Sequence, residues 1–318
     1  MNILITGAAG LLGSELVRQV IDKGWSVGGV DLSAQVETLS RCKVVTADLR
    51  DRAACRDLCA GFDTVVHTAA VQHHDDPPKL GRERFFRQNV EMTRHCVDAA
   101  EEKGVRHFVL ISSDMVYGIP RLRPFRETDT PLPIGPYGQS KLESERLCEA
   151  KCSGRMTVTI LRPRLIVGPG RLGILTKLFD RIRAGKRVPL IGDGTNRYQM
   201  VAVSDVARAV ICALEKSAGA TFNLGSSEVP TVKALMEGLA RSANSPSRVL
   251  RTPRRLTEAA LWTLHAFRVA PLVPEQFRIA GVDYVLDTTA ARQQLGWAPR
   301  FTDEEMLWQA YQQYVAAA

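Results

Sequence analysis

The sequence lacks the features that mark membrane-spanning, secreted and disordered proteins. No apolar run approaches the roughly 18 residues that a membrane span requires, so no integral membrane segment is expected. The first residues carry no basic stretch and turn glycine-rich at once, unlike a secretory signal. The seven cysteines form no paired Cys-x-x-Cys spacing, and reduced thiols in a cytoplasmic protein are the simplest interpretation. Repeats and low-complexity tracts are also missing, and the 45% of hydrophobic residues indicates a globular chain.

Aromatic residues are scarce, at 6% of the 318 positions, and this bears on how the net charge of +8 is interpreted. A surface for nucleic acids needs basic residues interleaved with exposed aromatic residues on one element. Here the arginines are spread widely along the chain. We therefore expect no nucleic-acid partner, and the excess positive charge favours small anionic ligands.

Short apolar runs alternate with helical stretches over residues 1–170, which is the pattern of a parallel sheet wrapped by helices. Continuous runs such as Phe108-Val109-Leu110-Ile111 suit strands that are buried on both faces. Strands are predicted at residues 2–6, 25–30, 43–47, 64–68, 107–112 and 158–161, and helices at 11–23, 85–103 and 137–151. The pattern predicts an α/β fold, a Rossmann-type doubly wound parallel sheet, in residues 1–170.

After residue 170, the sequence no longer alternates between short apolar runs and helical stretches. Helices predicted at 172–184, 203–215, 231–241, 256–267 and 302–317 are separated by turn-rich segments. We interpret residues 171–318 mainly as a smaller C-terminal substrate-binding lobe on the carboxyl ends of the strands, with some segments returning to the first domain. The segment 256–267 packs an apolar stripe on the core, or forms an apolar lid or membrane-touching face beside Arg251, Arg254 and Arg255.

A glycine-rich turn, Gly7-Ala8-Ala9-Gly10-Leu11-Leu12-Gly13, joins the first predicted strand to the first predicted helix. Glycine permits a tight turn and lets the backbone approach a pyrophosphate, which then lies at the positive end of the helix. Asp31 ends the second strand, where a carboxylate accepts both hydroxyls of an adenosine ribose and repels a 2′-phosphate. This favours NAD over NADP. Asp48 and Leu49 end the third strand, where they meet the adenine, or Asp48 caps the next helix.

Tyr137 and Lys141 are four residues apart in a predicted helix and therefore share one face. A cation beside a phenol stabilises the phenolate, so the tyrosine can exchange a proton nearer neutrality. Ser113, at the end of the fifth strand, supplies a hydroxyl that can hold a substrate oxygen. With a dinucleotide turn, these three residues make a complete set for hydride transfer.

Seven motifs in this order make the sequence resemble an extended short-chain dehydrogenase/reductase of the NAD-dependent epimerase/dehydratase kind. They are Thr6-Gly7-x-x-Gly10-x-x-Gly13, Asp48-Leu49, His67-Thr68-Ala69-Ala70, Asn89-Val90, Ser112-Ser113-x-x-Val116-Tyr117-Gly118, Tyr137-x-x-x-Lys141 and Arg162-Pro163-x-x-x-Val167-Gly168-Pro169. The resemblance implies that Tyr137 is the general acid/base. It also implies that Lys141 binds the nicotinamide ribose and favours ionisation of Tyr137, and that Ser113 hydrogen-bonds the reacting oxygen.

The resemblance further implies the contacts of the cofactor and a homodimer. The residues expected at the cofactor are Gly7, Ala9, Gly10, Leu11, Leu12, Asp31, Asp48, Leu49, Thr68, Ala69, Ala70, Asn89, Lys141 and Pro163. Asn89 is expected to brace the sheet near the site. The residues expected at the substrate are Ser113, Met115, Arg164 and Arg197.

Departures from the family pattern bear on the reaction. Nucleotide-sugar 4,6-dehydratases of this kind usually carry Thr-Asp-Glu where this chain has Ser113-Asp114-Met115, and methionine cannot act as a base. Dehydration by that route is therefore disfavoured, although Asp114 can still donate a proton. Leu165 stands where many nucleotide-sugar epimerases have asparagine, and Arg197 lies one place earlier than the family's arginine, although it can still reach a phosphate.

Two substrate classes therefore stay open. One is a nucleotide-activated sugar, handled by an epimerase or ketoreductase, which is the family's habitual substrate. The other is a hydrophobic alcohol or ketone, because residues 161–170, 192–203 and the tail from Tyr284 to Pro299 are more similar to 3β-hydroxysteroid dehydrogenases. A non-catalytic dinucleotide-sensing protein is a third, minor possibility.

His73-His74-Asp75-Asp76 has the residue types of a metal site. Adjacent side chains in a proline-flanked loop rarely converge on one ion, so no metal is expected.

Overall fold

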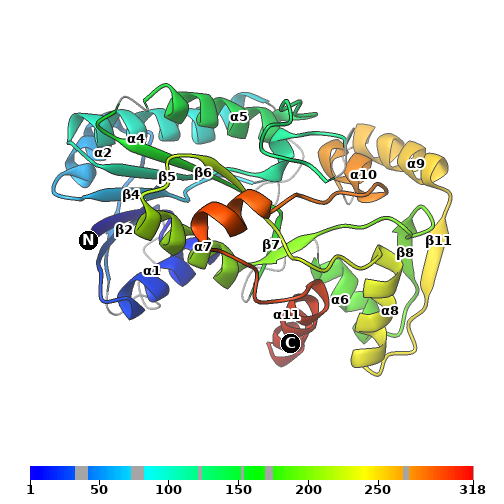
Figure 1. Cartoon of the computed structure of the whole chain (residues 1–318). Coiled ribbons are helices and arrows are strands. Elements are labelled where there is room, and N and C mark those ends of the chain that lie inside the picture. The colour runs from blue at the N-terminus through cyan, green and yellow to red at the C-terminus, as the bar shows by residue number, and fades with distance from the viewer. Residues whose placement is uncertain are drawn as a thin grey trace.

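The computed structural model of the chain describes residues 1–32, 42–72, 82–120, 124–151, 154–168, 175–267 and 272–317. In these residues a parallel sheet of seven strands has the order β10-β6-β5-β4-β1-β2-β3 (Figure 1). The strands are β1 (Asn2–Thr6), β2 (Ser26–Asp31), β3 (Lys43–Thr46), β4 (Thr64–His67), β5 (His107–Ile111), β6 (Thr157–Pro163) and β10 (Thr221–Leu224). Successive strands run outward from β1 to β3, and the chain then returns to place β4 on the other side of β1. This confirms the predicted doubly wound α/β fold and puts its switch point between β1 and β4.

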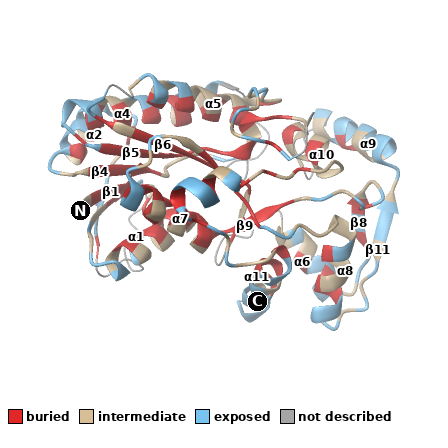
Figure 2. Ribbon diagram, viewed as in Figure 1, coloured by how far each residue is buried: buried red, intermediate tan, exposed pale blue. Residues whose placement is uncertain are grey.

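Helices cover both faces of this sheet. In Figure 1, α2 (Arg52–Cys59), α4 (Glu91–Glu102) and α5 (Pro136–Glu149) lie above it, and α1 (Leu11–Asp22) and α7 (Val203–Lys216) lie below it. Each helix buries one stripe, which in α1 consists of Leu12, Leu16, Val17 and Val20. The central strands β1, β4, β5 and β6 are consequently buried and largely red in Figure 2, whereas the edge strand β3 is mostly exposed.

The start of α2 corrects one expectation. Asp51, and not Asp48, caps this helix, because its carboxylate accepts hydrogen bonds from the backbone N–H groups of Ala53 and Ala54. The side chain of Asp48 instead bonds Arg50. Asp48 is thus not the cap residue of α2.

The helix predicted over residues 85–103 has an irregular beginning. It consists of α3 (Arg82–Phe85), a π-helical turn η3 (Phe86–Val90) and α4. The wider turn carries Asn89, whose side-chain amide bonds both backbone groups of Val71 and the hydroxyl of Ser140. Such π-turns are frequent at functional sites. Here the turn ties the segment after β4 to helix α5.

The remaining elements form a smaller layer at the right of Figure 1. Two short parallel pairs join β7 (Leu165–Val167) to β9 (Met200–Ala202) and β8 (Val188–Ile191) to β11 (Val249–Thr252). The helices here are α6 (Leu175–Arg183), α8 (Val232–Ser242), α9 (Arg254–Ala266), α10 (Pro274–Ala280) and α11 (Asp303–Ala316), with short helical turns η4 (Asp114–Val116) and η5 (Ala291–Leu295) elsewhere. Among the described residues, no helix has the length and apolar character needed to cross a membrane.

Candidate active site

A cavity of about 540 Å³ lies along the carboxyl ends of the central strands. Its walls include Gly7 after β1, Asp31 at the end of β2, Thr68 after β4 and Ser112 after β5. The volume is within the range of small-molecule sites, and the position at the switch point is where such sheets bind ligands. Sequence-expected residues that line it are Gly7, Ala9, Gly10, Leu11, Leu12, Asp31, Leu49, Thr68, Ala69, Ala70, Ser113, Asp114, Met115, Tyr137, Lys141, Pro163 and Arg164.

Gly7 and Gly13 of the glycine turn have no room for a side chain. Gly7 has a φ of +69°, and a Cβ on Gly13 would lie 2.0 Å from the carbonyl oxygen of Gly7. The first turn of α1 therefore packs directly on the loop that precedes it, with the N-terminal end of the helix facing the cavity. This is the geometry that an anionic diphosphate requires.

Asp31 is held at the rim of this turn. Its Oδ2 accepts a hydrogen bond from the backbone N–H of Ala9, at 3.0 Å. That contact joins the end of β2 to the glycine turn and fixes the carboxylate beside the cavity. The residues therefore fit a dinucleotide whose adenosine ribose lies at Asp31 and whose diphosphate lies at the turn.

Arg50 is a wall residue that sequence reasoning missed. Its guanidinium pairs with Asp48 at 2.5 Å, and this hydrogen bonding lowers the pKa of the Asp48 carboxyl. Asp48 itself is not among the residues that line the cavity, whereas Leu49 and Arg50 are. The cavity wall that follows β3 thus includes Leu49 and Arg50, whose charge Asp48 compensates.

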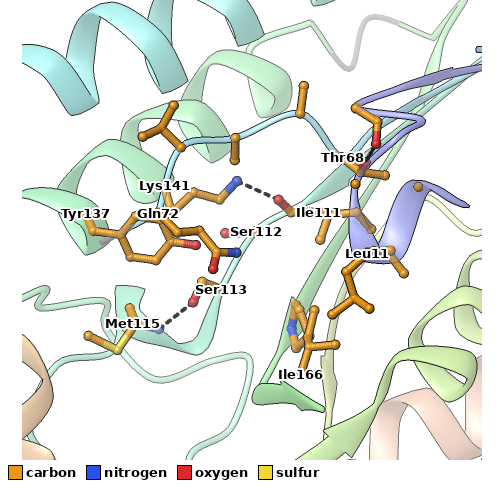
Figure 3. A pocket seen from close by; sticks show the side chains of 18 of the residues that line it. Leu11, Thr68, Gln72, Ile111, Ser112, Ser113, Met115, Tyr137, Lys141 and Ile166 are labelled. Carbon is orange, nitrogen blue, oxygen red and sulfur yellow. Dashed lines mark hydrogen bonds between the residues drawn. The ribbon is translucent and has the colours of Figure 1, made fainter. Parts of the chain in front are cut away.

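Ser113, Tyr137 and Lys141 share one wall of the cavity, as Figure 3 shows. Tyr137 and Lys141 lie one turn apart on α5, and Ser113 comes from the loop after β5. The Ser113 hydroxyl accepts a hydrogen bond from the backbone N–H of Met115 (3.2 Å) and donates to Asp114 Oδ1 (3.1 Å). Gln72, which the sequence did not single out, extends into the same space.

Lys141 is buried, and its ammonium donates a hydrogen bond to the carbonyl oxygen of Ile111 at 2.6 Å. Burial lowers its pKa to about 8, against the opposing effect of Glu145. The lysine remains mostly protonated at neutral pH, so its positive charge is present beside the cavity. A positive charge here favours the ionised form of a nearby phenol.

Beside Ser113, Asp114 forms a buried ion pair with Arg164. Arg164 Nη1 lies 2.8 Å from Asp114 Oδ2, and the guanidinium carbon lies 4.0 and 4.2 Å from the ring centroids of Tyr198 and Tyr284. Burial raises the pKa of Asp114, and the charge of Arg164 opposes that shift. Asp114 and Arg164 both line the cavity, and the carboxylate of Asp114 is held in this ion pair.

Besides Asp48, the expected residues Asn89 and Arg197 lie outside the cavity walls. Asn89 is buried behind them, where it holds Val71 and Ser140. Arg197 is exposed, and its guanidinium donates to the carbonyl oxygen of Val229. Successive side chains of an extended segment point to opposite sides, and here Tyr198 takes the side that faces the cavity. The segment His73-His74-Asp75-Asp76, considered above as a possible metal site, lies outside the described residues. Among the described residues, no group of three or more His, Cys, Asp or Glu side chains could hold a metal ion.

Comparison with known proteins bears on this geometry. The model of the NAD dependent epimerase/dehydratase family matches residues 3–225, well over half of the chain. The chain belongs to this family. The family model ends just after β10, so the match includes the sheet, the glycine turn and the wall that carries Ser113, Tyr137 and Lys141.

The proteins that this chain is similar to differ in the activities that their names give. A dTDP-glucose 4,6-dehydratase of Streptomyces niveus is 30% identical over 94% of this chain and 88% of its own length. A 3beta-hydroxysteroid-dehydrogenase/decarboxylase of Arabidopsis thaliana is 28% identical over 81% of this chain and 50% of its own length. A UDP-glucose-4-epimerase from Stenotrophomonas maltophila, solved with NAD and formylated UDP-arabinopyranose, covers 100% of both chains at 25% identity and a TM-score of 0.82.

Glu275 supports the helix that carries Tyr137, although no sequence motif indicates this role. It lies on α10, is buried, and accepts hydrogen bonds from the backbone N–H groups of Tyr137 (3.1 Å) and Gly138 (3.4 Å). These N–H groups belong to the first turn of α5, where a helix has donors without partners and a positive dipole end. A carboxylate from the smaller layer therefore anchors the start of the helix that carries Tyr137.

Replacing Glu275 with alanine should lower the free energy of unfolding by about 2–3 kcal/mol, because charge-assisted hydrogen bonds to a buried helix end are lost. Glu275→Gln keeps an acceptor oxygen and should cost less than half as much. Urea unfolding at pH 7 measures both. An alanine variant as stable as the native chain would contradict the anchoring role.

Proposed function

We propose that this chain binds NAD and transfers a hydride between the nicotinamide and a secondary alcohol or ketone carbon of a nucleotide-activated sugar, as an epimerase or ketoreductase. The observation that carries the proposal is the shared cavity. Its one end is the glycine turn with Asp31, and its other end is the wall formed by Ser113, Tyr137 and Lys141. One elongated ligand and one small reactant can therefore meet there.

The cofactor would be held by the residues already described. Asp31 would accept the adenosine ribose hydroxyls, the turn from Gly7 to Gly13 would meet the diphosphate, and Lys141 would bond the nicotinamide ribose. A carboxylate at Asp31 repels a 2′-phosphate, which supports NAD over NADP. When bound, the nicotinamide supplies a reversible acceptor for hydride.

The chain's own residues would handle the proton. Ser113 would hold the substrate oxygen by its hydroxyl, which Met115 N–H already orients. Tyr137, as phenolate, would take the hydroxyl proton during oxidation and return it during reduction. The buried ammonium of Lys141 would stabilise the phenolate and would be kept in place by the carbonyl of Ile111.

The same wall argues against dehydration. Met115 lines the cavity at the place where the 4,6-dehydratases usually carry a glutamate, and a thioether cannot remove a proton from carbon. The neighbouring Asp114 is paired with Arg164. These two observations support epimerisation or ketone reduction over loss of water.

A hydrophobic alcohol or ketone is the second candidate substrate. The cavity wall beyond Ser113 includes Leu165, Ile166, Leu175 and Ile279, which offer apolar contacts. The similarity to the 3beta-hydroxysteroid-dehydrogenase/decarboxylase points in the same direction. A homodimer, a cytoplasmic location and a boundary between the two lobes near residue 170 stay predictions.

Two measurements test the proposal. Mass spectrometry of small molecules released from the purified, denatured protein should show NAD or NADH. The protein should also bind UDP- or dTDP-sugars in a panel and convert at least one to its epimer or its reduced form. Steady consumption of NADH with a hydrophobic ketone and no response to sugar nucleotides would favour the second candidate. No bound dinucleotide and no turnover of either class would contradict enzymatic hydride transfer.

A further inference from the structure

Helix α9 turns its apolar face away from the protein. Of its residues only Leu261 is buried, whereas Leu256 is 70% exposed and Phe267, at its C-terminal end, is 74% exposed. With 3.6 residues per turn, Leu256 and Phe267 lie within about 20° of each other around the helix axis. The outward stripe between them consists of Leu256, Ala259, Ala260, Thr263 and Phe267, all of them exposed. It carries no charge over roughly three turns.

The polar residues of α9 lie on its other sides. Arg254 pairs with Glu258 at 2.6 Å, and both flank the inner side together with His265, which is half-buried. An ordinary surface helix has the opposite arrangement, with its apolar stripe on the core. The expectation that segment 256–267 packs its apolar stripe on the core is therefore wrong for most of the helix. In Figure 2 the helix is largely pale blue at the outer end of the molecule.

Trp262 lies at the border of this stripe. Its ring packs edge-on against Phe277 of α10, with 5.4 Å between the centroids, and about half of the side chain is exposed. The underside of α9 is thus fixed to α10, and the stripe is presented on a rigid support. Gln276 and Ile279 of that same helix line the cavity.

Basic residues precede the stripe, at the N-terminal end of α9 and along β11. Arg248 and Arg251 on and beside β11, together with Arg254 and Arg255 at the start of α9, are exposed. Two carboxylates offset them in part, because Glu258 pairs with Arg254 and Asp193 lies near Arg251. The described residues around the stripe keep an excess of positive charge. Contact with a second copy of this chain would bring like charges together, whereas an anionic surface complements them.

We propose that α9 docks this protein on an anionic lipid bilayer, with the stripe from Leu256 to Phe267 in the interfacial layer and the exposed Arg251 and Arg255 against the headgroups. An uncharged helical stripe, an interfacial tryptophan and a basic border are the features of helices that lie in the plane of a membrane surface. Apolar burial and charge act together, and each alone gives only weak binding. The α10 end of the cavity would then lie near the bilayer surface.

Sedimentation with vesicles tests this docking. The full-length protein should bind vesicles of phosphatidylglycerol more tightly than vesicles of phosphatidylcholine, and added salt should weaken the binding. The double variant Leu256→Asp/Phe267→Asp should lower the partition coefficient at least about tenfold. The matched control is Val315→Asp on α11, which is 44% exposed and should leave vesicle binding unchanged. Circular dichroism and thermal unfolding of each variant verify that it is folded.

Other outcomes overturn the proposal. Binding to neither kind of vesicle does so, as does binding that Leu256→Asp/Phe267→Asp leaves intact. A dimer seen by sedimentation equilibrium, lost in the double variant and unaccompanied by vesicle binding, would assign the stripe to a second copy of the chain. None of these readouts depends on the substrate, so they are independent of the proposed catalytic function.

Discussion

Replacing Tyr137 with phenylalanine should lower kcat by a factor of about 10² to 10⁴ and leave KM nearly unchanged. The ring and its edge-on packing against Phe85 are retained, so the variant loses the hydroxyl and little else. The removed group is the one that would exchange the substrate proton at the wall shared with Ser113 and Lys141. Steady-state kinetics with the sugar nucleotide found in the panel measures both constants.

A second tyrosine provides the control for this variant. Tyr311 on α11 is as buried as Tyr137 and packs against Phe179 away from the cavity, so Tyr311→Phe should leave kcat unchanged. A Tyr137→Phe variant that changes KM alone would show that Tyr137 binds substrate without moving a proton. Full activity would favour the non-catalytic, dinucleotide-sensing alternative.

Replacing Lys141 with methionine should lower kcat by at least about a hundredfold and yet make the protein more stable. Methionine is similar in length and brings no charge into the buried position. The native protein holds an ammonium whose pKa burial lowers to about 8, from an ordinary value of 10.5. Since each pKa unit corresponds to about 1.4 kcal/mol, and the hydrogen bond to Ile111 is lost, we expect a gain of about 1–3 kcal/mol at pH 7.

The gain should depend on pH in a defined direction. Below pH 8 the folded and unfolded chains both hold the proton, so the cost of the buried charge is fully present. Between pH 8 and 10.5 the folded chain loses the proton before the unfolded chain does, and the native protein gains stability relative to the variant. Denaturant unfolding of both proteins from pH 7 to pH 10 should show the difference shrinking. A constant difference would show that Lys141 is not a buried charge that limits stability.

The sequence predicts those parts of the site whose residues lie close together in the chain, in short motifs. The turn from Gly7 to Gly13, the pair Tyr137 and Lys141, and Ser113 each depend on a few neighbouring residues in a strand-turn-helix context. Parallel strands then bring these segments to one edge of the sheet, because their carboxyl ends all point the same way. The fold and the wall of the cavity were therefore predictable.

The remaining contacts join residues far apart in the chain. Glu275 accepts a hydrogen bond from Tyr137, which lies 138 residues before it, and no local pattern indicates such a pairing. Gln72 and Arg50 reach the cavity from loops whose paths the sequence does not define. The direction of Arg197 depends on which side of an extended segment faces inward, so a shift of one residue exchanges it with Tyr198.

The position of β10 at one edge of the large sheet affects how the protein is made. Its partner β6 is synthesised much earlier, and the segment between them builds α6, α7 and three strands of the smaller layer, β7, β8 and β9. On the ribosome, the apolar edge of β6 therefore stays open until residue 224 has emerged. A product that stops near residue 170 would expose that edge to other nascent chains, which is a route to aggregation. Completion of the seven-stranded sheet thus waits until residues up to 224 have been translated.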